Sequence, residues 1–316
     1  MKAIVIDSYG GPERMQLREL PDPQPAAGEV VIDVVCAGIN PVDWKIREGA
    51  LRDYYDWPLP LVLGCDVAGR IAVLGLGVAG FAPGDPVYAC TFPLVPGSGA
   101  FAEKVAVPAS AVAPMPKRLD FAAAAGVPLA ALTVWQSFYD AASLKAGDTV
   151  FIHAAAGGVG SFAVPIAKAA GAYVVGTASA GNADYVRGLG VDAFIDYRGQ
   201  DVVEAARRLV PHGFDIVLAA AAGDALAQSL AIARPGGIAV SITAELDAAA
   251  ATALGVRTAW VGMEANGRQL GLIGTLIDAG RVATPPTAVF PLAEAARALE
   301  TSKTGRVRGK LVLRVR

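Results

Sequence analysis

The stretch that decides the fold is HAAAGGVGSFAVPIAKAAGAYVVGTAS, residues 153–179. It follows an apolar, strand-like run at 148–152 and passes through small residues and glycines into a helical segment at 161–170. A second apolar strand is expected at 172–176. Strand, glycine turn, helix and strand form one βαβ unit, the first half of a doubly wound nucleotide-binding sheet.

Two glycines of this stretch have separate expected roles. Gly157 allows the backbone to approach a pyrophosphate, and Gly160 allows the helix to pack closely on the strand. The start of the helix offers free N–H groups and a partial positive charge to an anion. Ala155 stands at the first glycine position of the usual G-x-G-x-x-G pattern. A simple tight turn is the alternative, but the strands on both sides favour a nucleotide site.

The end of the second strand bears on which dinucleotide binds. NAD-binding chains usually carry Asp or Glu about 20 residues on, where it holds the ribose 2′-hydroxyl. Here that place falls on Thr177-Ala178-Ser179, without a carboxylate. Neutral Ser179 and Asn182 tolerate a 2′-phosphate that an acid would repel, so we expect NADPH.

Length and composition suit two domains of ordinary size. The chain has 316 residues, 54% of them apolar, and a net charge of −2. No basic stripe indicates nucleic acid as a partner. The cationic residues near the end of the chain are interpreted as lying on solvent-exposed strand faces: Arg306, Arg308, Lys310, Arg314 and Arg316.

Cysteine usage and hydropathy favour a cytoplasmic protein. Cys36, Cys65 and Cys90 lack paired metal-ligand spacing, which indicates free buried thiols in a reducing compartment. The first residues are typical of a strand and not of a signal peptide. Two uncharged runs, 121–139 and 150–167, are long enough to cross a membrane, but glycine, proline or polar residues interrupt both. We therefore expect no membrane association.

The pattern of expected secondary structure changes near residue 120. Before it, short strands between Gly/Pro turns indicate a small barrel or sandwich; they are expected at 2–7, 29–37, 66–74, 86–90 and 100–107. After it, helices at 121–125 and 129–142 lead into the nucleotide-binding unit. Four more strands, at 193–197, 214–219, 237–242 and 257–262, complete the six of a doubly wound sheet. The remaining expected elements are helices at 201–209, 224–233, 267–279 and 292–301 and strands at 289–292 and 310–315.

Motifs in fixed order extend along nearly the whole chain. They are MKAIVIDSYGGPE (1–13), AGINPVDWKIREG (37–49), LVLGCDVAGRI (61–71), PGDPVYA (83–89), LTVWQSFY (132–139), LKAGDTVFIHAAAGGVG (144–160), ARPGG (233–237), FPLAEAARAL (290–299) and GKLVL (309–313). Together they resemble the zinc-independent quinone oxidoreductase branch of the medium-chain dehydrogenase/reductases.

The resemblance implies an α/β protein of two domains. A GroES-like, β-rich catalytic domain would comprise residues 1–120, completed by 266–316. A Rossmann domain with its doubly wound parallel sheet would comprise 121–265, with NADPH in the cleft between the domains. Family members are commonly homodimers that pair through the edges of their Rossmann sheets.

The same resemblance bears on zinc. Zinc-dependent relatives carry Cys at the position of Asn40, and Gly-His-Glu where this chain has Gly64-Cys65-Asp66. Asn40 is a poor zinc ligand, and Cys65 with Asp66 cannot supply three protein ligands, so no metal is expected. Cys65 is read as a buried packing residue, with a reactive thiol as the alternative. The expected reaction is then hydride transfer to a conjugated acceptor, either a quinone or the β-carbon of an enone.

Site residues follow from the resemblance position by position. Asn40 would hydrogen-bond near the nicotinamide, with Thr133 beside it. The loop Ala156-Gly157-Gly158-Val159-Gly160 would wrap the pyrophosphate and the nicotinamide ribose. Thr177, Ser179, Asn182 and Tyr197 would surround the adenosine ribose and its 2′-phosphate. Many relatives carry Lys at the position of Asn182; Lys310 either compensates for that charge or is a strand-end charge.

The proton donor stays open. Tyr55 either donates a proton to a developing enolate or forms an apolar wall, and solvent is a further source. Asp43 is either an acid or, as we expect, an anchor for the loop around Asn40. Two alternatives to a small-acceptor reductase are a cofactor-binding protein of the same fold with little turnover, and an enoyl-thioester reductase.

Overall fold

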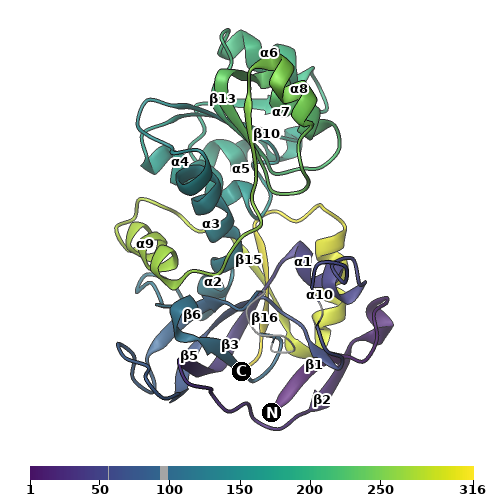
Figure 1. The fold of residues 1–316 in the computed structure, drawn as a ribbon, viewed down its shortest axis with the longest axis vertical. Helices are drawn as coiled ribbons and strands as arrows, with labels where there is room; N and C mark the ends of the chain where they lie inside the picture. The colour runs from purple at the N-terminus through teal and green to yellow at the C-terminus, as the bar shows by residue number, and fades with distance from the viewer. Residues whose placement is uncertain (56, 93–98) are drawn as a thin grey trace. The chain divides into compact units, whose positions relative to one another are not determined.

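The structure is a computed structural model that describes residues 1–55, 57–92 and 99–316. Its contacts divide the chain into two compact units (Figure 1). Unit 1 comprises Met1–Leu132, Glu264–Ala279 and Pro285–Arg316, and unit 2 comprises Thr133–Met263 and Gly280–Thr284. The first division falls after Leu132 and not at residue 120, because helix α2 (Phe121–Ala125) packs on strands of unit 1.

Unit 2 contains a parallel sheet of six strands in the order β11-β10-β9-β12-β13-β14. Each neighbouring pair is parallel. The strands are β9 (Thr149–Ile152), β10 (Tyr173–Ala178), β11 (Ala193–Asp196), β12 (Phe214–Ala219), β13 (Ala233–Ser241) and β14 (Arg257–Trp260). This is the doubly wound order, so the predicted Rossmann sheet is confirmed.

Helices pack on this sheet because its strands are apolar on both faces (Figure 1). One buried cluster joins Phe151, Phe214 and Val217 of the sheet to Ala206 of α6 and Leu230 of α7. Asp201 caps α6, since its side chain accepts a hydrogen bond from the amide of Glu204 at 2.7 Å. The helices are α4 (Gly160–Ala169), α5 (Ala183–Gly188), α6 (Val202–Leu209), α7 (Asp224–Ile232) and α8 (Ala248–Leu254), with a 3₁₀ turn at Ala180–Asn182.

Unit 1 is built from two sheets. The larger has the order β15-β16-β3-β5-β6-β8, with β7 also paired to β3, and the smaller has the order β2-β1-β4. The first strands along the chain are β1 (Lys2–Ile6), β2 (Gln16–Glu19), β3 (Glu29–Ile39), β4 (Leu61–Val62) and β5 (Asp66–Leu74). The others are β6 (Pro86–Cys90), β7 (Lys104–Pro108), β8 (Val112–Pro114), β15 (Thr287–Pro291) and β16 (Lys310–Arg314).

The C-terminal strand β16 completes the main sheet of unit 1. It pairs antiparallel with β3, with Leu311 opposite Ile39, and parallel with β15. The chain's last residues are thereby built into the domain that its first residues begin, as the resemblance implies. The start of β16 also lies next to the end of β3, which positions the polar cluster described below.

The helices of unit 1 cover its apolar strands. They are α1 (Pro41–Arg47), α2, α9 (Gly267–Asp278) and α10 (Ala295–Lys303), with 3₁₀ turns at Pro12–Arg14, Ala109–Ala111 and Leu292–Glu294. Helix α3 (Pro128–Trp135) begins in unit 1 and ends in unit 2. The predicted single helix at 129–142 is wrong in one respect, because a π-helical segment, Gln136–Ala141, follows α3.

Neither uncharged run forms one long helix. Residues 121–139 are divided among α2, α3 and the π-helical segment, and 150–167 between β9, the glycine loop and α4. In the part of the chain that the structure describes, no helix has the length and hydropathy that a membrane span requires.

Candidate active site

Strand β10 supports the glycine loop of unit 2 through two hydrogen bonds to Thr177. The Ala154 amide donates to the Thr177 hydroxyl at 3.2 Å, and the Ala155 amide donates to the Thr177 carbonyl at 2.8 Å. A Cβ on Gly160 would lie 2.3 Å from the Ala154 carbonyl oxygen. The expected role of Gly160 in close packing is confirmed. Thr177 is buried and its hydroxyl supports the loop; a contact of Thr177 with the cofactor stays a prediction.

Three consecutive backbone amides of the glycine loop are hydrogen-bond donors without a backbone acceptor. Within the described residues, the amides of Gly158, Val159 and Gly160 donate to no other backbone group. Val159 is the N-cap of α4 and provides no side-chain cap. A Cβ on Gly157 would meet only the Ala154 carbonyl oxygen, at 3.3 Å, so the space in front of Gly157 is open. Free amides at the start of a ten-residue helix form a site suited to a phosphate.

The carboxyl ends of β10 and β11 bring together the residues expected around a 2′-phosphate. The Asn182 side chain donates to the Ser179 hydroxyl at 3.3 Å, and the Tyr197 amide donates to the Ala178 carbonyl at 3.3 Å. Arg198, which sequence reasoning missed, donates from Nε to the Tyr197 hydroxyl at 3.2 Å, and its guanidinium lies 5.5 Å from the ring centre. Its signal was a cation directly after Tyr197. Arg198 supplies positive charge that Asn182 lacks.

Unit 1 contains a buried polar cluster around Asn40. The Asn40 Nδ2 donates to Asp66 Oδ2 at 2.8 Å, and Lys310 Nζ donates to Asn40 Oδ1 at 2.5 Å. The second oxygen of Asp66 accepts from the Leu129 amide at 2.8 Å. All three polar side chains are buried. The reading of Lys310 as an exposed strand-end charge is therefore wrong, because the start of β16 lies against the end of β3.

The Lys310 ammonium is held inside unit 1. The Lys310 side chain is 4% exposed, and its ammonium donates to Asn40 and lies 4.0 Å from Asp66 Oδ2. Compensation by Lys310 for the missing lysine at Asn182 stays a prediction. Burial lowers the pKa of Lys310, and the nearby Asp66 carboxylate opposes that shift.

Asp43 anchors the loop that carries Asn40. Its Oδ2 accepts from the Asn40 amide at 2.7 Å, which closes the first turn of α1 and confirms the expected anchoring role. Burial raises the pKa of Asp43 to about 7 and that of Asp66 to about 6. Burial also raises the pKa of the Cys65 thiol, so the reading of Cys65 as a buried packing residue is confirmed.

Three aromatic rings of unit 1 form a cluster. Tyr55 and Trp57 are stacked, with ring centres 4.8 Å apart and planes 14° apart. Phe92 meets the Tyr55 ring edge-on at 5.4 Å. Among the described residues no hydrogen bond is formed by the Tyr55 hydroxyl. The geometry favours Tyr55 as part of an apolar wall and leaves its hydroxyl free to donate.

Thr133 begins unit 2 and lies in α3. It is 5% exposed, and its carbonyl accepts from the Ser137 hydroxyl at 2.7 Å, where the π-helical segment widens the turn. Ala156, also buried, belongs to the glycine loop. The expected contacts of Thr133 and Ala156 with a cofactor stay predictions.

Comparison with known proteins identifies the family. The alcohol dehydrogenase GroES-like domain matches residues 26–117, and the zinc-binding dehydrogenase domain matches residues 189–313. The NADPH-dependent alkenal/one oxidoreductase of Arabidopsis thaliana chloroplasts is 33% identical over 325 residues, which cover 99% of this chain and 79% of that protein. The chain belongs to the quinone oxidoreductase branch of the medium-chain dehydrogenase/reductases.

Two further similarities agree with this family. The structure of the quinone oxidoreductase from Coxiella burnetii has a TM-score of 0.89 at 32% identity, covering 100% of this chain and 99% of that one. The chloroplast envelope quinone oxidoreductase homolog of Arabidopsis thaliana is 36% identical over 204 residues. That match spans 63% of this chain and 61% of the relative's length. The family predicted from the motifs is confirmed.

The polar cluster of this medium-chain family member does not fit a zinc ion. The Lys310 ammonium lies beside Asn40 and Asp66, where it would repel a second cation. Both oxygens of Asp66 already accept hydrogen bonds, and burial favours the neutral thiols of Cys65 and Cys90, whereas zinc binds thiolates. Within the described ranges, no three His, Cys, Asp or Glu side chains are grouped to hold a metal.

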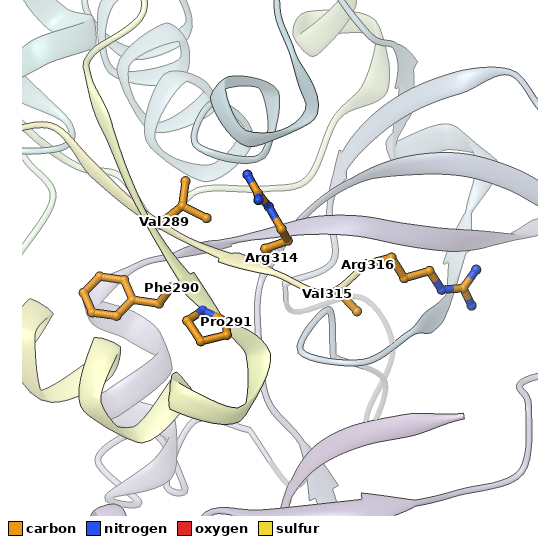
Figure 2. Close-up of a pocket in the computed structure, with 6 residues that line it drawn as sticks. All are labelled: Val289, Phe290, Pro291, Arg314, Val315 and Arg316. Carbon is orange, nitrogen blue, oxygen red and sulfur yellow. The ribbon is translucent and has the colours of Figure 1, made fainter.

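A shallow groove of about 450 Å³ lies elsewhere in unit 1 (Figure 2). It is lined by Val289, Phe290 and Pro291 of β15 and by the C-terminal residues Arg314, Val315 and Arg316. None of the predicted site residues lines it, so it carries no part of the proposed chemistry.

Proposed function

We propose that this family member transfers a hydride from NADPH to a quinone or an α,β-unsaturated carbonyl. The observation that carries the proposal is the row of free amides at Gly158, Val159 and Gly160 beside a strand end without a carboxylate. The similarity to an NADPH-dependent alkenal/one oxidoreductase, which covers 99% of this chain, supports the same reaction. NADPH, when bound, supplies the hydride, and the chain supplies binding, orientation and exclusion of water.

Charge supports the phosphorylated cofactor. The end of β10 carries neutral Ser179, and Asn182 donates to it. The guanidinium of Arg198 beside Tyr197 adds a cation that suits a phosphate. An NAD-binding chain would be expected to carry an acid in the place of Ser179.

The acceptor is expected to be flat and conjugated. The stacked rings of Tyr55 and Trp57 offer an apolar plane, with Phe92 at its edge. Asn40 holds its amide in a fixed network and would orient the nicotinamide, while the Tyr55 hydroxyl or solvent would supply the proton that completes reduction.

A homodimer is part of the proposal. Strand β14 is an edge of the unit 2 sheet, and its outer side pairs with no strand among the described residues. Its last residue, Trp260, is 56% exposed. An unpaired strand with an exposed tryptophan suits pairing with the same strand of a second copy.

The test is acceptor-dependent oxidation of NADPH by the purified protein. We expect loss of reduced-cofactor absorbance with 1,4-benzoquinone or an alkenal, and no loss with a saturated aldehyde of the same length. NADPH binding without oxidation across a broad panel of quinones and enones would reject the reaction and favour a binding protein. Oxidation only with enoyl thioesters would favour the thioester reductase.

A further inference from the structure

The side-chain amide of Asn40 is held at both ends. Asn40 follows β3, caps α1 and is 2% exposed. Its Nδ2 donates to Asp66 at 2.8 Å, and its Oδ1 accepts from Lys310 at 2.5 Å. One N–H of the amide remains for another partner, because the Asn40 side chain also accepts from the Asp43 amide in the capping box at the start of α1.

The charges of the two partners decide which way this amide points. The Lys310 ammonium can only donate hydrogen bonds, and an ionised Asp66 can only accept them. Turning the amide by half a revolution would place Nδ2 against the ammonium and Oδ1 against the carboxylate. Two such mismatches in a buried site would each leave polar atoms unpaired. Only one orientation of Asn40 is therefore compatible with its surroundings.

The partners are themselves fixed by the fold. Asp66 begins β5 opposite Gly38 of β3, and its second oxygen accepts from the Leu129 amide. The Lys310 stem passes Gly126, where an added Cβ would lie 3.2 Å from the Lys310 Cβ. Partners on two strands, β5 and β16, thus hold the amide of Asn40 at the end of β3, and a change in either charged side chain would release it.

Building on the function proposed above, we propose that Asp66 and Lys310 are positioning residues that lock the Asn40 amide in one orientation. The remaining N–H of Asn40 then offers a hydrogen-bond donor of fixed direction to the nicotinamide. A purely structural role is a poor explanation for the pair, because a buried ion pair contributes little net stability compared with apolar residues.

The lock depends on the ionisation of Asp66. Burial raises the pKa of Asp66 to about 6. Below that pH a protonated Asp66 can donate as well as accept, and the preference for one amide orientation is lost. The titratable groups that face Asp66 are Asp43 on α1, Cys65 beside it, Cys90 on β6 and Lys310 on β16.

The kinetic test compares single and charge-balanced variants. We expect Lys310→Met and Asp66→Asn each to lower kcat by about 100-fold, while KM for NADPH stays within about threefold, since a misplaced group costs about that much in rate. The double variant restores charge balance but not the lock, so its kcat should be no higher. The control is a surface ion pair of the same unit, Lys104→Met with Asp22→Asn, which should keep kcat within about twofold. A double variant with kcat near that of the wild type would overturn the proposal.

A second measurement uses the wild-type protein and no turnover. The chain has three asparagines, Asn40, Asn182 and Asn266, so selective ¹⁵N labelling gives a spectrum that Asn182→Ser and Asn266→Ser variants assign. At pH 8 we expect the Asn40 side-chain protons to exchange with water at least about tenfold more slowly than those of Asn182 and Asn266 and to shift on adding NADPH, and we expect this difference in rate to shrink at pH 5. Asn40 side-chain protons that exchange as fast as those of Asn182 and Asn266 at pH 8 would overturn the proposal even if no variant folds.

The two proposals fail in different ways. A locked amide that responds to NADPH, in a protein that oxidises no NADPH with any acceptor, would reject the proposed reaction and keep the positioning of Asn40. An active reductase with a mobile Asn40 amide would reject the positioning and keep the reaction.

Discussion

A methyl group on Gly176 of β10 would lie 2.9 Å from the Cβ of Ala155 in the glycine loop. Real Cβ atoms do not approach so closely, so the two positions depend on each other. Ala155 stands where related loops carry their first glycine, and the extra methyl group is accommodated because the neighbouring strand has no side chain there. The alanine at position 155, in place of the usual glycine, is thus accommodated by a glycine at position 176.

This pairing predicts a compensating double mutant. Gly176→Ala should lower the free energy of unfolding by about 1–3 kcal/mol, because the added methyl group overpacks the loop against the strand. Adding Ala155→Gly should recover part of the loss; Val191 Cγ1, 3.1 Å from the added Cβ, limits the recovery. Urea unfolding measures both, with Gly188→Ala, which meets nothing within 4 Å, as the control. Equal losses in the single and double variants would contradict the pairing.

Cofactor preference should follow charge at the ends of β10 and β11. Ser179→Asp should weaken NADPH binding by at least about tenfold, because its carboxylate would repel the 2′-phosphate, and should strengthen NADH binding. Arg198→Gln should weaken NADPH by about tenfold and leave NADH unchanged, since one charge-assisted hydrogen bond is lost. Fluorescence titration gives the dissociation constants, and exposed Arg187→Gln on α5 is the control. Equal dissociation constants of the wild-type protein for NADPH and NADH would refute this assignment.

The contribution of Asp43 to stability should fall as pH rises through the acidic and neutral range. The pKa of Asp43 is raised by burial to about 7, from an ordinary value of 3.8, so the folded chain binds this proton more tightly than the unfolded chain. Its stabilising contribution is complete below about pH 4 and is lost by about pH 7. Asp43→Asn should therefore reduce the fall in unfolding free energy between pH 5 and pH 8 by about 2 kcal/mol.

Urea unfolding at the two pH values measures this difference. The control is Asp53→Asn, whose carboxylate is 86% exposed and should leave the pH dependence unchanged. Parallel pH profiles for the wild type and Asp43→Asn would show that Asp43 is not the group that titrates.

The proposed dimer makes its own prediction. Trp260→Arg should convert a dimer to a monomer, because it places a charge at the exposed end of the β14 edge. Light scattering after size exclusion measures the mass, and Leu209→Arg, a similarly exposed apolar residue at the end of α6, should remain dimeric. A wild type that stays monomeric at all concentrations would exclude the dimer.

The sequence predicts much of the fold because its strongest signals are local. The central strands β9, β10 and β12 of the unit 2 sheet are short apolar runs, and all six strands lie close to where they were expected. Helix α1 gives no comparable signal, since seven residues complete less than two full turns. The strand Gln16–Glu19 has four mostly polar residues, and the strand Leu61–Val62 has only two residues. Neither gives a pattern that can be recognised in the sequence.

The polar cluster could not be predicted for a different reason. Asn40 and Lys310 are 270 positions apart, and only the pairing of β16 with β3 brings them together. A lysine near a chain end is usually exposed, which made the sequence interpretation of Lys310 wrong. The structure explains the expected anchoring role of Asp43, since Asp43 lies three residues after Asn40 and forms a capping box with it.

Transfer of deuterium from labelled NADPH to an alkenal tests the central claim most directly. NADPH carrying deuterium at the transferable C4 position is incubated with the purified protein and the alkenal, and the product is analysed by mass spectrometry and NMR. We predict one deuterium at the β-carbon of the saturated product, with the added proton at the α-carbon coming from solvent. NADPH that binds while the label stays on the cofactor or enters water would contradict the account.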